Sequence, residues 1–319
     1  MNVLITSAGR RVSLLRAFQQ QTAARNGSTF AGDRDPLAPA LQLADRAFVL
    51  PPIEDPTYLD ALLSIVARWK IRLLVPTIDT ELPFLAENAP AFQSIGCTPL
   101  ISSKKLVAVS GDKWLTVCTF SELGFRTPSS WLPGAAEPDS LPKALFVRPR
   151  AGSASLNAFR VDRDDLEARL AEVQSPIIQE YIGDREITID ALIDLDGNPV
   201  HYVPRLRIRT LAGESIQGIT IKDKDLGDWI LELLHAVARM GGRGAMTLQA
   251  FLSPEGPVFS EINPRFGGGF PLAQEAGGHY PEWILQLLEG KSIPARIGEY
   301  EEGISMTRYF SEEFTRQPS

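Results

Sequence analysis

The spacing of apolar residues in the first hundred positions predicts short strands that alternate with helices. Residues 3–6 and 73–76 are apolar runs typical of buried strands, and a helical apolar face follows the first of them. Asp55-Pro56 is typical of a helix start, because Asp caps the first turn and Pro fits its first position. The helical apolar faces consist of Val12, Leu15 and Phe18 and of Leu59, Leu62, Leu63 and Val66. This pattern predicts a βαβ unit with a parallel sheet.

The second part of the chain has a different pattern, dominated by strands and hairpins. Residues 102–141 predict a helical connector with a Pro-rich exit, and one strong helix over residues 226–237 ends at Gly241-Gly242. The predicted strands cover residues 144–148, 177–181, 187–195, 200–207, 245–252 and 258–263. A hairpin-rich part that follows a βαβ part indicates a chain of mixed α/β and α+β class.

Composition narrows the class of protein. The 319 residues allow two or three structural units, and 44% hydrophobic with 22% charged residues is typical of a globular chain. A net charge of −7 argues against a nucleic-acid partner. No apolar run approaches the roughly 20 residues of a membrane helix, and the first residues do not form a signal peptide. We therefore expect a cytoplasmic protein with no membrane partner.

The sequence is poor in thiol and imidazole groups. It contains only Cys97 and Cys118, and only His201, His235 and His279. These numbers argue against a disulfide framework and against a zinc site. A bound cation or phosphate would therefore depend on oxygen ligands and on Lys and Arg side chains.

The segment 247–269 contains the most informative candidate site. With Pro254-Glu255-Gly256 as a three-residue hairpin loop, position 253 would face 257 and Gln249 would face Glu261. Asn263 would project on the same side, so three oxygen-bearing side chains would converge, as Mg²⁺ shared with phosphate requires. The alternative is the polar outer face of a solvated hairpin. Arg265 follows and could neutralise the carboxylate or stabilise a transferring phosphoryl group.

A second hairpin is predicted at Asp196-Gly197. A two-residue loop there pairs position 188 with 205 and 186 with 207. Glu186, Thr188, Arg205 and Arg207 would then share one face, opposite Ile187, Ile189 and Ala191. On this pattern alone, an ordinary solvent-facing side with cross-strand ion pairs is favoured for the arginines, including Arg209.

Three further segments carry weaker signals. Arg148 ends a predicted strand and precedes small residues, including Gly152 and Ser153, whose backbone N–H groups could approach a phosphate. The turn at residues 7–11 has one glycine where a dinucleotide fingerprint needs three, so a plain strand-to-helix turn is favoured. Asp79 and Glu81 follow a strand end, where ligands often bind, but a helix start with acidic residues is equally consistent.

Taken together, these segments resemble the ATP-grasp superfamily, and most of all the synthetase units of the carbamoyl phosphate synthetase large subunit. The resemblance implies a pre-ATP-grasp βαβ domain at residues 1–101, linker helices and a lid subdomain at 102–182, and a large subdomain with a C-terminal tail at 183–319. ATP would be clamped between the lid and the large subdomain.

The resemblance also implies roles for single residues. Phosphate binding would involve Lys113, Arg148, Gly152 and Ser153; adenine binding would involve Glu180, Tyr181 and Ile182; ribose binding would involve Glu186; metal binding would involve Gln249, Glu261 and Asn263. Arg265 would face the phosphoryl group. The resemblance makes Arg205 and Arg207 candidates for holding a carboxylate or an acyl phosphate, as catalytic residues beside Arg265.

The activity implied by the resemblance is that of an ADP-forming ligase. ATP and Mg²⁺, with Mn²⁺ as an alternative, would activate a carboxylate as an acyl phosphate for attack by an amine or similar nucleophile. Such chemistry requires cations and exclusion of water more than a nucleophilic side chain. Two alternatives stay open: a phosphotransferase or carbamoyl-phosphate-type enzyme without ligation, and a non-catalytic ATP-binding protein. The partners would be small molecules, and a homodimer would be typical of the family.

Overall fold

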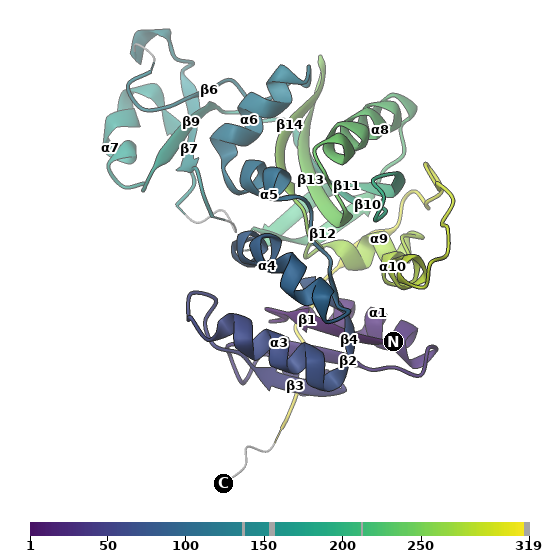
Figure 1. The fold of residues 1–319 in the computed structure, drawn as a ribbon. Helices are drawn as coiled ribbons and strands as arrows, with labels where there is room; N and C mark the ends of the chain where they lie inside the picture. Colours follow the sequence, from purple (N-terminus) through teal and green to yellow (C-terminus); the bar gives the residue numbers. More distant parts are fainter. Residues whose placement is uncertain (136–137, 153–156, 212, 316–319) are drawn as a thin grey trace.

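Three β-sheets organise the structure, a computed structural model that describes residues 1–135, 138–152, 157–211 and 213–315. The first sheet lies at the bottom of Figure 1, the second extends outward at the upper left, and the third lies at the upper right. The predicted mixture of a parallel and an antiparallel part is confirmed.

The first sheet is parallel throughout and has the strand order β3-β2-β1-β4-β5. Its strands are β1 (Asn2–Thr6), β2 (Thr29–Asp33), β3 (Arg46–Val49), β4 (Ile71–Pro76) and β5 (Thr98–Pro99). Its helices are α1 (Val12–Ala23), α2 (Pro39–Leu43), α3 (Tyr58–Trp69) and α4 (Leu82–Ser94), with the short helix η1 (Asp79–Glu81) before α4. The central strands β1 and β4 are almost wholly buried, as their apolar runs predict.

The predicted start of a helix at Asp55-Pro56 is wrong by two residues. Helix α3 begins at Tyr58, and no side chain caps it. The Asp55 carboxylate instead accepts hydrogen bonds from the Thr57 N–H at 2.8 Å and the Thr57 hydroxyl at 2.6 Å. Asp55 therefore organises the turn before the helix, because a short carboxylate side chain bonds its own backbone two residues on.

The second sheet is small and has the order β6-β9-β7-β8. Its strands are β6 (Ser130–Trp131), β7 (Ala144–Pro149), β8 (Phe159–Asp162) and β9 (Pro176–Glu180), with helices η2 (Pro138–Ser140), η3 (Arg163–Asp165) and α7 (Leu166–Leu170). Helices α5 (Lys104–Gly111) and α6 (Lys113–Glu122) precede it as the predicted connector. This sheet has a hydrophobic cluster of its own, which includes Leu145, Val147 and Ile178. We call residues 130–180 the lid.

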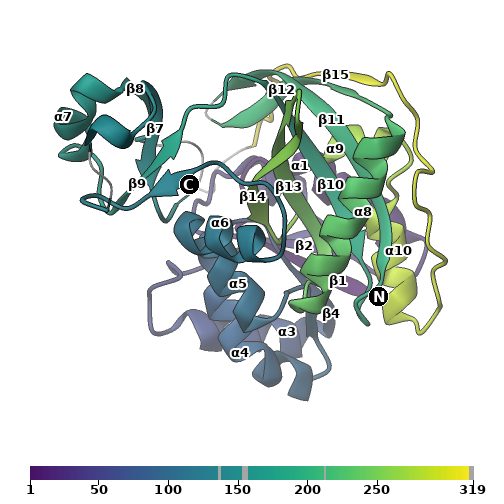
Figure 2. The same cartoon turned by 90° about the horizontal axis from the view of Figure 1, so that it is seen from above.

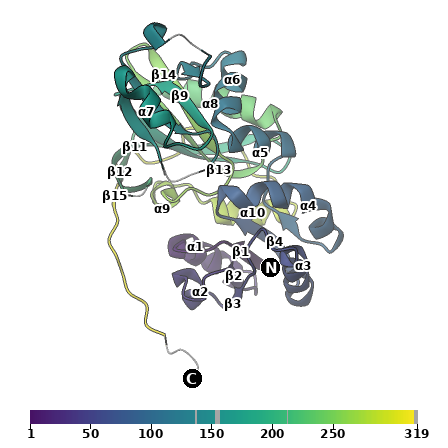
Figure 3. The ribbon, with the colours of Figure 1, turned by 90° about the vertical axis from the view of Figure 1, so that its left-hand side faces the viewer.

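The third sheet is antiparallel, with the order β14-β13-β10-β11-β12-β15. Its strands are β10 (Arg185–Ile193), β11 (Pro199–Leu211), β12 (Glu214–Thr220), β13 (Gly244–Ser253), β14 (Gly256–Asn263) and β15 (Ser305–Thr307). Helix α8 (Lys224–Arg239) covers one face, as Figure 2 shows from above, and buries Ile230, Leu233 and Leu234 there. Helices α9 (Phe270–Glu275) and α10 (Tyr280–Leu288) follow β14 and lie between this sheet and α1, in the lower part of the body in Figure 3.

The β13–β14 hairpin reaches the predicted pairing by an unpredicted route. Ser253 pairs with Gly256 rather than with position 257, so the predicted three-residue loop is wrong. A register shift between Gln249 and Ala250 then changes the pairing, and Gln249 faces Glu261 as expected. A β-bulge on β14 inserts one extra residue. The bulge offsets the shorter loop, so Gln249 and Glu261 still pair.

The β10–β11 hairpin has the predicted register where it concerns the candidate site. Thr188 pairs with Arg205, and the apolar residues Ile187, Ile189 and Ala191 are fully buried on the opposite face. The register shifts near the turn, where the Asp194 carboxylate accepts hydrogen bonds from three successive backbone N–H groups. The turn is therefore a loop organised by Asp194 and not a simple two-residue turn.

Among the described helices, none is both long enough and apolar enough to cross a bilayer.

Candidate functional site

A cavity of about 1260 Å³ lies where the three sheets meet. Every described residue that the sequence predicts for the site lines it, namely Lys113, Arg148, Gly152, Glu180, Tyr181, Ile182, Glu186, Arg205, Arg207, Gln249, Glu261, Asn263 and Arg265. Ser153 lies outside the described residues. The structure thus brings together side chains from α6, the lid and four strands of the third sheet.

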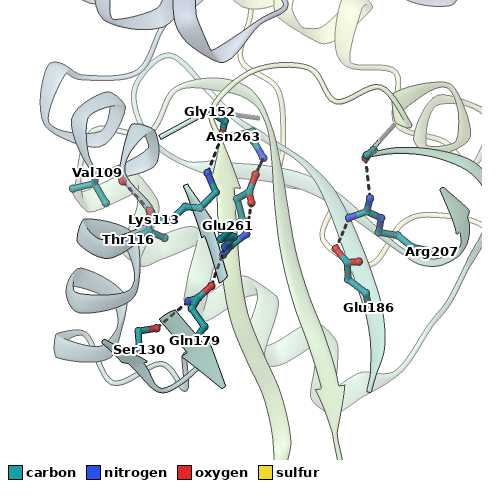
Figure 4. A network of polar contacts seen from close by, with 12 residues as sticks. Val109, Lys113, Thr116, Ser130, Gly152, Gln179, Glu186, Arg207, Glu261 and Asn263 are labelled. Carbon is teal, nitrogen blue, oxygen red and sulfur yellow. Dashed lines mark hydrogen bonds and ion pairs between the residues drawn. The ribbon is translucent and has the colours of Figure 1, made fainter. Parts of the chain in front are cut away.

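Glu261 is at the centre of a polar network that joins the lid to the third sheet (Figure 4). Arg148 donates to one Glu261 carboxylate oxygen at 3.2 Å, and the Asn263 amide donates to the other at 3.1 Å. The same Arg148 donates through Nε to Gln179 at 2.9 Å, and Gln179 in turn donates to Ser130 at 2.9 Å. Arg148, on β7, is therefore held between Gln179 on β9 and the Glu261 carboxylate on β14.

The charges around Glu261 keep its carboxylate ionised. Burial on its own raises the pKa of Glu261, but Arg148, Lys113 and Arg265 and the Asn263 amide together hold that pKa below its usual value. Burial lowers the pKa of Lys113, and the Glu261 charge opposes this shift. The Lys113 ammonium donates to the Gly152 carbonyl at 2.7 Å, which places it where the lid approaches α6.

Gln249, Glu261 and Asn263 form a set of oxygen donors suited to a hard divalent cation. Gln249 on β13 and Glu261 on β14 are cross-strand partners, and Asn263 is two residues further along the same face. No group of three His, Cys, Asp or Glu residues among the described positions has the geometry to hold a metal ion. A divalent cation here would therefore use one carboxylate, amide oxygens and oxygens from a bound ligand, a donor set that fits Mg²⁺.

Arg207 and Glu186 form an ion pair across β10 and β11. Arg207 also donates to the Gly213 carbonyl at 2.9 Å. Burial raises the pKa of Glu186, and the Arg207 charge opposes that shift. Both terminal nitrogens of the Arg207 guanidinium group therefore donate to protein acceptors, one to Glu186 and the other to Gly213.

Arg205 forms a buried ion pair with Asp190, a residue that the sequence analysis did not identify. The Arg205 Nε lies 3.0 Å from the Asp190 carboxylate, and the two side chains are only 3% and 2% exposed. Arg205 Nη1 is buried with no hydrogen-bond partner in the described part of the chain. Asp190 is on the same face of β10 as Glu186 and Thr188, so strand parity was the signal that could have identified it.

A glycine turn covers this ion pair. A Cβ atom on Gly269 would overlap Arg205 Nη2, and one on Gly267 would overlap the Thr247 hydroxyl oxygen. Only glycine at these two positions lets the backbone approach so closely. The turn at residues 267–269 therefore forms a wall of the cavity directly against the Arg205 guanidinium.

Arg265 connects the third sheet to the first. Its Nη2 lies 2.6 Å from the Asp79 carboxylate, at the start of η1, and its Nη1 donates to the Phe266 carbonyl at 3.2 Å. Asp79 thus lines the cavity and also begins a short helix. Both interpretations of the sequence, a position beside a ligand site and an acidic helix start, therefore apply to it. Glu81 instead is fully buried and accepts hydrogen bonds from Tyr58 at 2.8 Å and Ser7 at 2.9 Å.

The segment at residues 180–182 leads from the lid to the third sheet. The backbone N–H groups of Glu180 and Tyr181 donate to the carbonyls of Ser129 and Ala144. Tyr181 is 38% exposed, and its ring lies under the Arg160 guanidinium, which is 4.6 Å from the ring centre. A flat exposed ring at the cavity edge provides a surface on which another planar group can stack.

Two family models match separate parts of the chain. Residues 3–100 match a model described as "PylC-like, N-terminal domain". Residues 172–310 match a model described as "ATP-grasp in the biosynthetic pathway with Ter operon". The first match covers the parallel sheet, and the second covers the third sheet together with strand β9 of the lid.

Curated proteins are similar in sequence to about three quarters of this chain. A formate-dependent phosphoribosylglycinamide formyltransferase of Synechococcus sp. (strain WH7803) is 27% identical over 254 residues, which are 74% of this chain and 63% of the relative. The chain thus spans about three fifths of the length of such curated relatives.

Solved structures share the fold at low identity. The biotin carboxylase domain dimer of 2-oxoglutarate carboxylase from Hydrogenobacter thermophilus, in complex with MgADP, ADP and bicarbonate, matches with a TM-score of 0.75 and 16% identity, over 95% of this chain and 73% of the other. The L-amino acid ligase from Bacillus licheniformis matches with a TM-score of 0.71 and 19% identity, over 89% and 73%.

The family expected from the sequence motifs is therefore confirmed, while the narrower resemblance to carbamoyl phosphate synthetase units stays a prediction. The lid and the antiparallel third sheet enclose a cation-rich cavity beside the parallel N-terminal sheet. The same chain matches ATP-grasp proteins in sequence and in structure. The chain has the ATP-grasp fold, and its residues 172–310 match an ATP-grasp family model.

Proposed function

We propose that this chain is an ATP- and Mg²⁺-dependent ligase that activates a carboxylate as an acyl phosphate for attack by an amine or similar nucleophile. The observation that supports this most is the meeting of lid cations, oxygen donors of the third sheet and Arg265 in a single cavity. Phosphoryl transfer depends mainly on positioning and on stabilisation of charge, and this cavity supplies cations and oxygen donors rather than nucleophilic side chains.

The lid side of the cavity would bind the nucleotide. Lys113 and Arg148 would contact the phosphates, together with backbone N–H groups of the loop at Gly152 and Ser153. Adenine would lie against the segment from Glu180 to Ile182. Because the N–H groups of Glu180 and Tyr181 are already bonded, an adenine contact to a backbone N–H would fall to Ile182.

Glu186 would bind the ribose hydroxyl groups, and Arg207 would hold Glu186 in place. Carboxylates often accept hydrogen bonds from ribose hydroxyls. The ion pair with Arg207 fixes the orientation of the carboxylate and favours its ionised form despite burial. In this proposal Arg207 therefore acts through Glu186, while Arg205 and Arg265 are nearer to the reacting groups.

Gln249, Glu261 and Asn263 would hold Mg²⁺, with Mn²⁺ as an alternative. When bound, such a cation neutralises charge on the phosphate oxygens of ATP. Arg148 and Asn263 bond both Glu261 oxygens, so cation binding would require these contacts to rearrange. Arg148 would then be available for the phosphates.

The reaction would proceed in two balanced steps. A substrate carboxylate oxygen attacks the γ-phosphorus of ATP, which forms a P–O bond, breaks the bond to the β-phosphate oxygen and releases ADP. An amine nitrogen then attacks the acyl carbon, a C–N bond forms, and the C–O bond to phosphate breaks. Inorganic phosphate leaves, and the amine gives up a proton.

Arg205 and Arg265 would stabilise the charge that develops in these steps. Arg205 is held by Asp190 and has a buried Nη1 without a described partner, so it can donate one further hydrogen bond. Charge-assisted bonds from Arg to carboxylate or phosphate are strong and directional. The proteins to which the chain is similar include one that is formate-dependent and one that is an amino acid ligase, which supports activation of a carboxylate.

Release of ADP and phosphate, screened against pools of carboxylates and amines, tests the proposal. We expect release that needs both Mg²⁺ and an acid, and a loss of at least 100-fold in Glu261→Ala. Glu255→Ala is the matched control, because Glu255 is at the tip of the same hairpin and its side chain is 78% exposed. Turnover that survives in Glu261→Ala would contradict the metal assignment.

The same assay separates the two rival functions. ATP binding without ADP release for any pool would favour a non-catalytic nucleotide-binding protein. Acyl phosphate that accumulates without a new amide product would favour a phosphotransferase. Measurement of the molar mass in solution tests the homodimer that we also propose, since a structural neighbour is described as a domain dimer.

A further inference from the structure

The first sheet contributes its own wall to the cavity, at a place where α/β proteins commonly bind ligands. The strand order β3-β2-β1-β4-β5 reverses direction between β1 and β4. Such a reversal leaves a crevice outside the carboxyl ends of the two strands. Arg10 and Arg11, which follow β1, and residues 77–80, which follow β4, line the cavity from this crevice.

The backbone of the turn after β1 has little left to offer a ligand. The Gly9 N–H donates to the Asp33 carboxylate at 2.7 Å, the Ala8 N–H to Gly32 at 3.2 Å, and the Arg11 N–H to Ala8 at 2.8 Å. A dinucleotide cradle would need such N–H groups for the pyrophosphate. Recognition at this wall therefore depends on side chains.

The charges that line the cavity favour anions, although the whole chain carries −7. The cationic residues are Arg10, Arg11, Lys113, Arg148, Arg205, Arg207 and Arg265, and the acidic residues are Asp79, Glu180, Asp184, Glu186 and Glu261. Four of the arginines have carboxylate partners, and Lys113 lies at the lid. Arg10 belongs to none of these pairs, and its side chain is exposed.

The negative charge of Asp79 does not neutralise the positive charge of this wall. Its carboxylate lies 2.6 Å from Arg265 Nη2, so its charge is balanced within the cavity. Asp33, at the end of β2, lies beside the turn in space, and one of its oxygens accepts from the Gly9 N–H and the other from the Asp35 N–H. The charged group that remains to face a ligand from this wall is the guanidinium group of Arg10.

We propose that Arg10 forms a second anion subsite and that the acid activated here carries a second anionic group, a carboxylate or a phosphate. This inference rests on the proposed function and names the class of its substrate. The reacting carboxylate lies towards Arg205 and Arg265, and the second anionic group lies on Arg10 at the strand ends of the first sheet. Monoanionic acids lack this contact and bind more weakly.

Two matched pairs of acids test the subsite in the full-length chain with ATP and Mg²⁺. Succinate is compared with butyrate, and 2-phosphoglycolate with glycolate, so that each pair differs in one anionic group. Binding is measured by titration calorimetry, and ADP release gives KM and kcat. We expect the chain to prefer the dianionic member of at least one pair by tenfold or more, which is about 1.4 kcal/mol.

Three variants test whether that preference depends on Arg10. Arg10→Gln should remove the preference, mainly through KM, and Arg10→Lys should keep part of it because the charge remains. Arg34→Gln should keep all of it, because Arg34 is an exposed arginine that follows the neighbouring strand β2 and does not line the described cavity. The pair that shows the larger preference distinguishes a phosphate from a carboxylate.

The outcomes separate this proposal from the proposed function. An equal preference in Arg10→Gln and the unmodified chain, or no preference in either pair, would overturn the subsite even where ADP is released. A preference in calorimetry that depends on Arg10, without ADP release for any acid, would support the subsite and contradict the ligase activity.

Discussion

Replacing Asp190 with Asn would leave the Arg205 guanidinium buried without a carboxylate partner. Both side chains are almost fully removed from water, at 2% and 3% exposure, so solvent cannot screen the charge that remains. Removal of one member of a buried ion pair typically costs about 3–5 kcal/mol. Asn keeps an oxygen that can accept from Arg205 Nε, so we expect the lower value, about 3 kcal/mol.

That cost corresponds to about a hundredfold shift in the unfolding equilibrium. For a chain of 319 residues, an unfolding entropy of roughly 2.1 cal/mol/K per residue turns it into a decrease in Tm of about 4–5 °C. Differential scanning calorimetry measures the shift. Chemical denaturation monitored by tryptophan fluorescence provides an independent value.

A double-mutant cycle makes the reasoning refutable. Arg205→Met alone leaves Asp190 buried without an ion-pair partner, and Asp190→Leu alone leaves Arg205 so. The variant that combines these two substitutions removes both charges together. The combined variant should therefore be more stable than the sum of the two single losses predicts, by more than about 1 kcal/mol. Single losses that add up would show that the two residues are not coupled and would refute the argument.

Three further predictions concern residues of the N-terminal part of the chain. Burial raises the pKa of Cys97 to about 12, so its thiol should resist iodoacetamide at pH 8 in the folded chain and react in urea; rapid labelling in the native state, detected by mass spectrometry, would contradict this. Burial raises the pKa of Glu81 above 4.5, so the folded state holds the proton more tightly. The free energy of unfolding should therefore fall as the pH rises from about 4.5 through the folded pKa, and Glu81→Gln should remove this slope in urea titrations while the exposed control Glu87→Gln keeps it. Asp79→Asn should reduce kcat about tenfold and change the KM for ATP little, because it loosens Arg265 and not the nucleotide contacts; an unchanged kcat in ADP-release assays would count against this role.

The parts of the fold that follow from the sequence are those with a strong apolar period. The buried runs of β1 and β4 and the apolar stripe of α8 predict elements that the structure confirms. Strands β12 and β15 were not predicted, because Ile216 and Ile219 of β12 do not alternate with period two and β15 is only three residues long. Their place in the sheet depends on pairing with β11 and with each other, which local patterns do not encode.

The candidate site was predicted residue by residue, but its internal partners were not. Parity along β14 and a family motif were sufficient to select Glu261 and Asn263, and the structure places both in the cavity. The bulge that aligns Gln249 with Glu261 has no clear local signature, because an inserted residue in a strand does not change its composition. The Asp79–Arg265 contact joins positions 186 residues apart and emerges only from packing of the first sheet against the third.

The separate hydrophobic cluster of the lid has a mechanical consequence. Leu145, Val147 and Ile178 are buried among residues of the lid itself, so its internal packing does not depend on contact with the rest of the chain. Polar contacts such as that between Arg148 and Glu261 join it to the third sheet. Rotation of the lid as a rigid body would exchange those contacts and leave its own packing intact. The width of the cleft and the stability of the lid are thus separate properties, and substitutions can alter one without the other.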